Sequence, residues 1–556
     1  MARESSRKRE GNFRPIAVVG VSTQFPGEGG TEGFWRDIVS GTDAISDVPA
    51  SHWLIEDYYD SDPKAEDKTY CKRGGFLSPV SFDAIGLGLP PNTLPATDTS
   101  QLLTLMIARR LLQKEGADRF PHIDRERIGI MLGVTSATEL VASLSSRLQR
   151  PVWLNAMRAS GLPEQQAQEI CQRIADSYVP WQEASFPGLL GNVVAGRVAN
   201  RLDLGGPNFV SDAACASSLS AMQTAIHSLQ LGETDMVVTG GADAMNDIFM
   251  YMCFSKTPAF SPSGECRPFS DKADGTLIGE GVGLFALRRL EDAEKDGDPI
   301  LAVIRGLGGA SDGRASSVYA PRPSGQARAI AKAYEVAGYG PETIGLLEAH
   351  GTATKAGDVA EFKGLRTVFD PVRRESGPSI ALGSVKSQIG HTKAAAGAAG
   401  VFKAVMALHH KVLPPTLKVD RPNPALEMES SAFYLNTETR PWIHGAEHPR
   451  RASVSSFGFG GSNFHITLEE YTGPGRHADR IRTLPAELIT LSAPDRDTLI
   501  ARCRALLESQ AEAESCVIAR TSQEGFDSEQ PERLILLLKS GQRWQSRMQR
   551  AIDLLE

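Results

Sequence analysis

One cysteine and two histidines of this 556-residue chain stand at positions where their side chains could do chemistry. Cys215 has neighbours no larger than serine on both sides, so a ligand could approach it closely. The pattern before it, 205–210, predicts a turn and a short strand, and 218–231 predicts a helix that ends at Gly232. The thiol is therefore expected where a strand gives way to a helix.

This position suggests a nucleophile. Backbone N–H groups at a helix N-terminus stabilise an anion, so we expect a lowered pKa for the Cys215 thiol and a more reactive thiolate. The backbone N–H of Cys215 would also be one donor to an oxyanion. A buried cysteine that serves only packing is the common alternative for a single thiol. Further residues are needed to choose between the two.

Each of the two histidines follows a short apolar segment and stands next to a glycine. His350 comes after 346–349, and His391 comes after 383–389 and before a small-residue helix expected at 392–408. One such histidine is more often an ordinary core or surface residue than a catalyst. Two histidines with the same arrangement favour a shared site.

One thiol and two imidazoles match a chemistry in which an acyl group moves onto sulfur and negative charge then develops on a second thioester oxygen. Two neutral imidazoles that donate N–H groups would stabilise that enolate. A hydrolase triad needs a single histidine, oriented by a carboxylate. The second histidine therefore distinguishes the two reactions.

With these motifs the chain resembles the β-ketoacyl synthases, the condensing enzymes of fatty acid and polyketide assembly. The resemblance covers about residues 15–470, and its motifs occur in the order of the family. They lie at 15–20 with 25–27, 210–219, 279–281, 346–354, 383–391 and 455–463.

The resemblance implies that Cys215 accepts the growing acyl chain, while His350 and His391 bind a malonyl thioester and stabilise the enolate left after carbon dioxide departs. The reaction would be a decarboxylative Claisen condensation that yields a β-ketoacyl thioester. An acyl carrier protein would carry the substrates and supply the phosphopantetheine. No cofactor and no metal are therefore expected on this chain itself.

Further site residues follow from the same resemblance. Lys386 matches the lysine that orients the active-site network, and Glu361 matches its carboxylate partner; a buried structural ion pair is a compatible interpretation. Thr352 and Thr354 match residues that contact the pantetheine arm. Ala353 stands where the family more often has glycine or serine, and a methyl group there should be tolerated.

Two phenylalanines near the end of the resemblance have expected roles. The backbone N–H of Phe457 would be the second oxyanion donor, and Phe459, between glycines, matches the gating phenylalanine of the family. Glycines on both sides allow the loop to move, so the ring could open or block the malonyl pocket. A tight turn with core aromatic residues is the structural alternative.

Within the family, the chain is most similar to ketosynthases of polyunsaturated fatty acid synthases and related iterative type I synthases. The segments 212–216 and 387–393 differ from the common versions in modular polyketide synthases, and 249–258, 357–362 and 434–442 favour the same subfamily. The alternative enzyme is a ketosynthase of a modular or an enediyne-type polyketide synthase.

Other relatives fit the residues less well. A non-catalytic, chain-length-factor-like interaction subunit would lack the nucleophile, and a loading decarboxylase would have glutamine in place of Cys215. A non-elongating synthase module usually lacks one of the two histidines. A thiolase would use a second cysteine near the C-terminal end of the fold, but none lies between Cys266 and Cys503.

The implied fold is the thiolase fold, an α/β architecture in which two related βαβ-type halves form a layered α-β-α-β-α core. Alternating strand and helix patterns with glycine-rich joints suit this class. No repeat in the sequence reveals the duplication. Because members of the family dimerise through the central sheet, we expect a homodimer.

The chain divides into three expected regions. Residues 1–12 are polar and expected to be disordered, 13–470 would form the ketosynthase domain, and 471–556 would form a small α/β linker domain toward an adjacent acyltransferase domain. In the last region, 488–491 predicts a strand and 496–510 predicts an amphipathic helix.

The segment 139–185 has the pattern of an insertion. It contains two helical patterns, at 140–150 and 163–178, the second opened by Pro163 at a first-turn position. The family has an interface in this region, so Met157 is expected near a partner subunit. A surface helical hairpin is the alternative.

Composition argues against several classes of function. A net charge of -8 disfavours a nucleic-acid partner. The seven cysteines contain no CxxC pair, which indicates neither a disulfide framework nor a zinc site. No signal peptide precedes residue 15, and no apolar run is long enough to span a bilayer. We therefore expect no membrane association and a reducing, cytoplasmic location.

Overall fold

The computed structural model describes residues 13–114, 116–135, 138–244, 246–373, 377–445, 447–475, 486–509, 515–539 and 542–556. The chain forms two compact units, divided between residues 479 and 480. The domain boundary expected after Glu470 stays a prediction, and Tyr471, the next residue, packs against the core of the larger unit.

One half of the main sheet of the larger unit runs in the spatial order β7-β6-β8-β9-β1. Within it, β6 is parallel to β7 and β8, whereas β9 is antiparallel to β8 and β1. The strands are β1 (Ile16–Gln24), β6 (Ile128–Gly133), β7 (Asn208–Ser211), β8 (Met236–Asp243) and β9 (Gly281–Arg289).

The other half repeats this arrangement in the order β12-β11-β16-β17-β10, with β14 added outside β12. Strand β11 is parallel to its neighbours β12 and β16, as β6 is in the first half. Strand β17 is antiparallel to β16 and β10, as β9 is to β8 and β1. The two halves therefore share one topology, a duplication that no sequence repeat revealed. These strands are β10 (Ala302–Ser311), β11 (Leu346–Glu348), β12 (Ile380–Gly383), β14 (Phe433–Leu435), β16 (Arg451–Gly458) and β17 (Ser462–Glu469).

Two helices form the middle layer between the sheet halves. Helix α9 (Ser217–Leu231) and helix α15 (Ala396–His410) each contact strands of both halves. Helices α3 (Thr99–Leu112) and α8 (Val193–Leu202) cover the outer face of the first half. Helices α12 (Pro323–Ala337) and α13 (Lys355–Phe369) lie together on the outside of the second half. The predicted layered α-β-α-β-α architecture is confirmed.

Small residues allow the middle layer to pack this closely. A side chain at Gly283 of β9 would approach Ala398 of α15 to 3.0 Å, and one at Gly400 of α15 would approach Val454 of β16 to 2.9 Å. The alanines and glycines of α15 therefore permit the close helix-to-sheet contact on both of its faces. At the end of α9, Gly232 adopts a left-handed conformation with φ 73°, as the sequence predicted for a helix stop.

Shorter elements connect these layers. They are α1 (Gly30–Ser40), β2 (Ile45–Asp47), α2 (Ile55–Tyr58), β3 (Arg73–Gly75), β4 (Gln113–Lys114), β5 (Ala117–Asp118), α10 (Ile248–Lys256), α11 (Leu290–Asp296), α14 (Lys386–Ile389), β13 (Val412–Leu413) and β15 (Arg440–Pro441).

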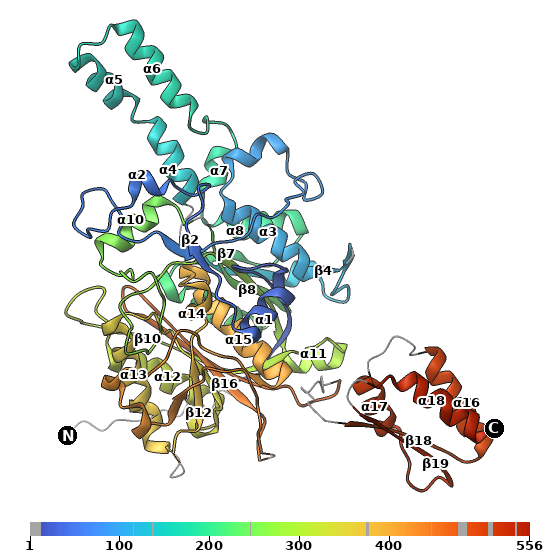
Figure 1. Cartoon of the computed structure of the whole chain (residues 1–556). Helices are drawn as coiled ribbons and strands as arrows, with labels where there is room; N and C mark the ends of the chain where they lie inside the picture. The colour runs from blue at the N-terminus through green and yellow to red at the C-terminus, as the bar shows by residue number, and fades with distance from the viewer. Residues whose placement is uncertain are drawn as a thin grey trace. The chain divides into compact units, whose positions relative to one another are not determined.

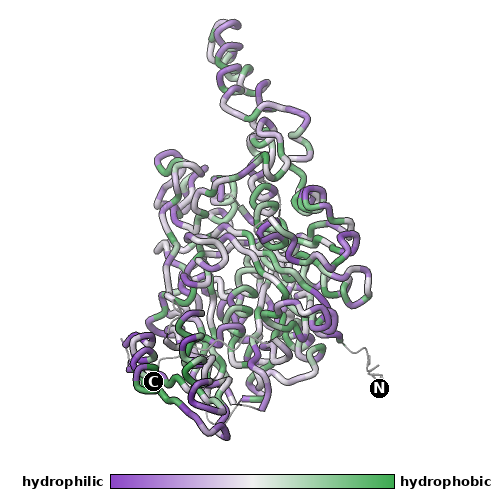
Figure 2. The backbone as a smooth tube through the Cα atoms, turned by 90° about the vertical axis from the view of Figure 1, so that its right-hand side faces the viewer, coloured by the Kyte–Doolittle hydropathy of each residue, from purple (hydrophilic) through white to green (hydrophobic). Residues whose placement is uncertain are grey.

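The insertion contains more helices than the sequence predicted. Helices α4 (Thr138–Arg147), α5 (Arg150–Ala159) and α6 (Glu164–Asp176) replace the two expected, and α7 (Ser185–Leu189) follows. Pro163 precedes α6 as its N-cap residue and does not lie in its first turn. Helices α5 and α6 form a hairpin that projects from the larger unit in both views (Figures 1 and 2).

The smaller unit combines a two-stranded antiparallel sheet with helices. Strands β18 (Ala486–Ala493) and β19 (Glu532–Lys539) pair along their whole length. The predicted strand at 488–491 and helix at 496–510 are confirmed as β18 and α16 (Arg496–Ser509). The other helices are α17 (Ser515–Glu524) and α18 (Trp544–Leu555).

Candidate active site

Cys215 lies in a short 3-10 turn, η3 (Ala214–Ala216), directly before α9. The strand before it is β7, so the predicted strand-to-helix position is confirmed. Ala214 has a left-handed φ of 49°, which makes the entry to the helix a tight turn. The Ser456 hydroxyl donates to the carbonyl oxygen of Cys215 at 2.6 Å and ties this turn to the second half of the sheet.

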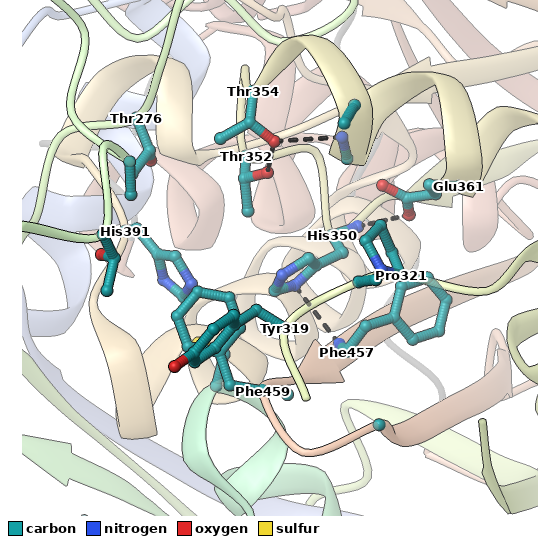
Figure 3. A pocket seen from close by; sticks show the side chains of 18 of the residues that line it. Thr276, Tyr319, Pro321, His350, Thr352, Thr354, Glu361, His391, Phe457 and Phe459 are labelled. Carbon is teal, nitrogen blue, oxygen red and sulfur yellow. Dashed lines mark hydrogen bonds between the residues drawn. The ribbon is translucent and has the colours of Figure 1, made fainter. Parts of the chain in front are cut away.

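His350 and His391 line one cavity of about 260 Å³ together with Cys215. Their ring centroids are 5.3 Å apart and the rings are nearly perpendicular, at 85°. Figure 3 shows both rings facing the cavity beside Phe459. The tertiary structure thus brings together the three side chains that the sequence singled out.

Both histidines reach this cavity from the second half of the sheet. His350 follows β11, as predicted. His391 does not follow its strand directly, because the short helix α14 stands between β12 and the histidine. A second 3-10 turn, η6 (Lys393–Ala395), then leads into α15.

Backbone N–H groups determine which ring nitrogen of each histidine carries the proton. The N–H of Phe457 donates to Nδ1 of His350 at 3.3 Å, and the N–H of Lys393 donates to Nδ1 of His391 at 3.1 Å. Each Nδ1 is thus an acceptor, so the proton of each neutral ring lies on Nε2. Nε2 of His391 is buried without a hydrogen-bond partner among the described residues.

Both imidazoles are held neutral. Burial lowers the pKa of His350 well below its ordinary value, and the Lys386 charge acts in the same direction. Burial and the Lys386 charge also lower the pKa of His391 well below 6.5. Two neutral Nε2–H donors therefore line the cavity beside the thiol.

The expected oxyanion role of the Phe457 amide is not supported, because its N–H donates to His350. The backbone N–H of Phe459, two residues later, donates toward the sulfur of Cys215. Strand β16 ends at Gly458 and Phe459 lies in the turn that follows, so the amide of Phe459 leaves the direction of the strand in which Phe457 lies. Phe457 instead orients His350.

The expected lowering of the Cys215 pKa is also wrong. Burial raises the pKa of this thiol to about 11, and the charges of Lys386 and Lys393 only partly offset that effect. Cys215 is 8% exposed, so water stabilises its thiolate poorly. The thiol is therefore neutral at pH 7 in this cavity.

Lys386 and Glu361 form no salt bridge with each other, so the alternative interpretation of a buried structural ion pair is not supported. Instead, both hold the peptide groups of His350. The Lys386 ammonium donates to the carbonyl oxygen of His350 at 2.5 Å, while the Glu361 carboxylate accepts the N–H of His350 at 2.8 Å and of Gly351 at 2.7 Å. Burial raises the pKa of Glu361 to about 7 and lowers that of Lys386.

Thr352 and Thr354 line the same cavity, where a pantetheine arm was expected. Their hydroxyls are 3.2 Å apart, and Thr354 also accepts the N–H of Gly357 as the N-cap of α13. Between them, Ala353 is fully buried with a left-handed φ of 62°. This conformation favours glycine, so the methyl group is accommodated but strained.

Asp358 supports this loop and was missed in the sequence. Its carboxylate accepts the N–H of Ala353 at 3.0 Å and of Phe269 at 2.6 Å, and burial raises its pKa to about 7. Its place three residues before Glu361 puts both carboxylates on one face of α13, a spacing that could have revealed it.

A buried ion pair supports the turn that carries Lys386. Glu348 accepts the backbone N–H of Val385 at 2.6 Å and pairs with the ammonium of Lys403 at 2.7 Å. Both charged side chains are almost fully inaccessible to water. No motif pointed to Lys403, because it lies inside the small-residue helix α15.

The expected gating residue Phe459 is 47% exposed and lies at the cavity (Figure 3). Its ring contacts Tyr319 edge-on, with centroids 6.0 Å apart. The N–H of Gly460 donates to the carbonyl oxygen of Val318, so the two loops are joined next to the ring. The sequence did not single out Val318 or Tyr319, since neither belongs to a recognisable motif.

Comparison with protein families agrees with this site. The family description "Beta-ketoacyl synthase, N-terminal domain" matches residues 13–293, and "Beta-ketoacyl synthase, C-terminal domain" matches 301–420. "Ketoacyl-synthetase C-terminal extension" matches 422–529. The chain belongs to the β-ketoacyl synthase family, whose members transfer acyl groups and form carbon–carbon bonds.

Sequence comparison with known proteins indicates which type of β-ketoacyl synthase the chain resembles. The chain is 42% identical over 497 residues to a polyunsaturated fatty acid synthase polypeptide of Thraustochytrium sp., covering 88% of this chain and 18% of that protein. It is 36% identical over 458 residues to a phenolphthiocerol/phthiocerol polyketide synthase polypeptide of Mycobacterium tuberculosis, covering 82% of this chain and 23% of that protein. It therefore spans less than a quarter of the length of either relative. It is a ketosynthase of the polyunsaturated fatty acid synthase and polyketide synthase type.

Solved structures show the same fold. The ketosynthase from module 6 of the bacillaene synthase from Bacillus subtilis aligns with a TM-score of 0.70 at 31% identity, covering 97% of this chain and 84% of that chain. The oxazolomycin ketosynthase domain from Streptomyces albus aligns with a TM-score of 0.71 at 29% identity, covering 97% and 87%.

Two further observations concern the part of the chain that the structure describes. No helix in it is both long and apolar enough to cross a membrane. The cysteines whose side chains it describes, Cys71, Cys171, Cys215, Cys253, Cys266 and Cys503, are all free thiols.

Proposed function

We propose that this chain catalyses decarboxylative Claisen condensation of a Cys215-bound acyl group with a malonyl thioester. The sulfur of Cys215 attacks the acyl thioester carbonyl, and the carrier thiol leaves with the proton. The malonyl group then loses carbon dioxide, and its enolate carbon attacks the acyl carbonyl on Cys215. The products are a β-ketoacyl thioester, carbon dioxide and the Cys215 thiolate, which takes up a proton from water to restore the thiol.

The observation that carries this proposal is the pair of neutral Nε2–H donors of His350 and His391 beside one thiol. Such donors stabilise the negative charge of the enolate oxygen without supplying a proton that would quench the carbanion. The backbone N–H of Phe459 faces the sulfur, so it would hold the oxyanion formed at the acyl carbonyl. Lys386 and Glu361 would keep His350 in place.

The proposed substrates are thioesters of an acyl carrier protein, whose pantetheine arm would pass Thr352 and Thr354. We also propose an adjacent acyltransferase domain as the source of malonyl groups, with residues after the larger unit as the link toward it. The polyunsaturated fatty acid synthase relative supports the proposal that this chain acts in a synthase of that type. The ring of Phe459 would open and close the malonyl side of the cavity.

A homodimer is supported by the edge of the main sheet. Among the described residues, β7 pairs with β6 alone, so the N–H and C=O groups along its other side have no strand partner. An exposed sheet edge is a ready template for pairing with another chain. Antiparallel pairing of two β7 strands would place the two Cys215 turns near the interface, because η3 follows β7 directly.

Intact-protein mass spectrometry tests the nucleophile. After incubation with a panel of acyl thioesters, one acyl adduct is expected on the wild type and none on Cys215→Ala. Peptide mapping should place the adduct on Cys215, and the panel would rank the acyl chains. Condensation that persists in Cys215→Ala, or labelling confined to Cys71, Cys171 or Cys503, would contradict the proposal.

A further inference from the structure

Another buried lysine, Lys393, lies two residues after His391 and is not accounted for by the proposed reaction. Lys393 is 6% exposed. Its ammonium pairs with the carboxylate of Asp243 at 2.8 Å and donates to Oδ1 of Asn246 at 2.6 Å and to the carbonyl oxygen of Gly279 at 3.0 Å. The three hydrogens of the ammonium therefore have acceptors from three segments of the first half of the fold.

The backbone of Lys393 is strained. Its φ is 46°, a left-handed value that costs a residue with a side chain about 1–2 kcal/mol. The two-fold relation of the halves gives it a counterpart, because Ala214 opens the turn η3 before α9 just as Lys393 opens η6 before α15. Ala214 has nearly the same φ, 49°. The turn geometry is thus common to both halves, but the anchors differ: the Asp212 carboxylate accepts the N–H of Ala214 at 2.9 Å, whereas Lys393 supplies a buried ammonium from within its own turn.

This conformation directs the backbone N–H of Lys393 toward the ring of His391. Its N–H donates to Nδ1 of His391 at 3.1 Å, and the next N–H, of Ala394, donates to the Asp243 carboxylate at 3.1 Å. Asp243 thereby binds the turn twice, through the ammonium and through the backbone. A relaxed turn would rotate the Lys393 N–H away from the ring.

We propose that Lys393 is a positioning residue for His391: its buried ammonium clamps the strained turn η6 so that its own backbone N–H holds Nδ1 and leaves Nε2–H directed into the cavity. The inference rests on the proposed function, because it assigns Lys393 to the malonyl half of the reaction. Acyl transfer to Cys215 needs no donor from His391. Loss of the clamp should therefore affect decarboxylation far more than acylation.

The groups around the clamp form one buried polar cluster. Glu280 accepts the N–H of Asn246 at 2.6 Å and pairs with His52 at 2.8 Å. Burial raises the pKa of Asp243 despite the Lys393 charge, and loss of that charge would raise this pKa further.

The test compares Lys393→Met with Arg288→Gln, which breaks the buried ion pair between Arg288 and Asp298 outside the site. Acylation of Cys215 is measured by mass spectrometry, and carbon dioxide release from malonyl-pantetheine is measured by single-turnover kinetics. The His391 tautomer is measured by NMR of protein with 15N-labelled histidine, and the signal is assigned with His391→Asn.

For Lys393→Met we expect acylation within a few-fold of wild type. Carbon dioxide release should fall at least about 10-fold, the loss of orientation of one donor, and the Nε2–H tautomer should lose its dominance. Arg288→Gln should change none of these.

Wild-type carbon dioxide release in Lys393→Met, an unchanged tautomer, or an equal loss of acylation would overturn the proposal. The double variant Lys393→Gln with Asp243→Asn replaces the ion pair with two amides and serves if the single variant does not fold. It should recover the tautomer and most of the carbon dioxide release, and a folded double variant that stays slow would count against the clamp. The tautomer is measured without substrate, so its outcome is separate from failure of the proposed function.

Discussion

The backbone N–H of Phe457 and Nδ1 of His350 are joined by a 3.3 Å hydrogen bond between residues 107 positions apart in the chain. This bond makes Nδ1 an acceptor and places the proton of the neutral ring on Nε2. Lys393 does the same for His391. The two rings are therefore matched donors, although different segments of the fold orient them.

Replacement of either histidine should separate the two halves of the reaction. For His350→Ala and for His391→Ala we expect Cys215 to be acylated still, because attack by the thiol needs neither Nε2–H donor. Carbon dioxide release from a malonyl thioester should fall by about 100-fold or more, the size usual for loss of one such donor. Mass spectrometry and single-turnover decarboxylation measure the two steps. His227→Ala, at an exposed position on α9, is the control. An equal loss of acylation and decarboxylation in the His350 or His391 variant would refute the assignment.

The reactivity of Cys215 toward a neutral alkylating reagent should rise steeply with pH. Because burial raises the pKa of this thiol to about 11, the thiolate fraction increases nearly tenfold per pH unit between pH 7 and about 10. The rate of carbamidomethylation by iodoacetamide, measured by mass spectrometry at Cys215, should follow that slope without a plateau. Cys215→Ala gives the background from exposed Cys253. A plateau near neutral pH would mean that the thiolate is already formed.

Stability and decarboxylation should respond to pH in opposite directions through Glu361 and Asp358. Both pKa values are raised to about 7, above the values near 4 of an unfolded chain. The folded protein therefore binds extra protons between about pH 4 and 7, so this pair's contribution to the free energy of unfolding is present at low pH and is lost as the pH rises through 7. The charged Glu361, however, is the better acceptor for the N–H of His350.

We therefore expect decarboxylation to accelerate as the pH rises through about 7, with one apparent transition for the coupled pair. Glu361→Gln should be slower and should lack most of this transition. Relative to that variant, the wild type should be more stable at pH 5.5 than at pH 8 in urea unfolding. Decarboxylation that slows between pH 6 and 8 would show that the charged carboxylate is not needed.

Ala353→Gly should stabilise the protein. The left-handed φ of 62° strains any side chain at this position, whereas glycine adopts it freely. The gain is reduced by the greater freedom of glycine in the unfolded chain, so we expect the free energy of unfolding to rise by about 0.5–1 kcal/mol. Urea unfolding measures it. Ala333→Gly inside helix α12 is the matched control and should destabilise by about 1 kcal/mol.

Local patterns in the sequence were sufficient to locate the reactive residues. The thiol at a strand-to-helix junction, the histidine after β11 and the glycines around Phe459 are features of a few consecutive residues, and such features depend on backbone periodicity and turn chemistry. The order of those motifs also indicated the family and the layered fold. The sequence also predicted the small-residue helix α15, although it did not reveal that this helix packs between two sheet halves.

The sequence could not predict the directions of the hydrogen bonds in the site or how deeply its side chains are buried. The choice of Phe459 over Phe457 as the amide facing Cys215, and the separate contacts of Lys386 and Glu361 with His350, depend on the orientation of groups that meet only in the folded chain. The raised pKa of Cys215 depends on how much water the surrounding layers exclude. Residue types and spacing therefore determined which groups could react, whereas the tertiary structure decided their tautomers, partners and charges, because hydrogen-bond geometry and desolvation arise from contacts between distant segments.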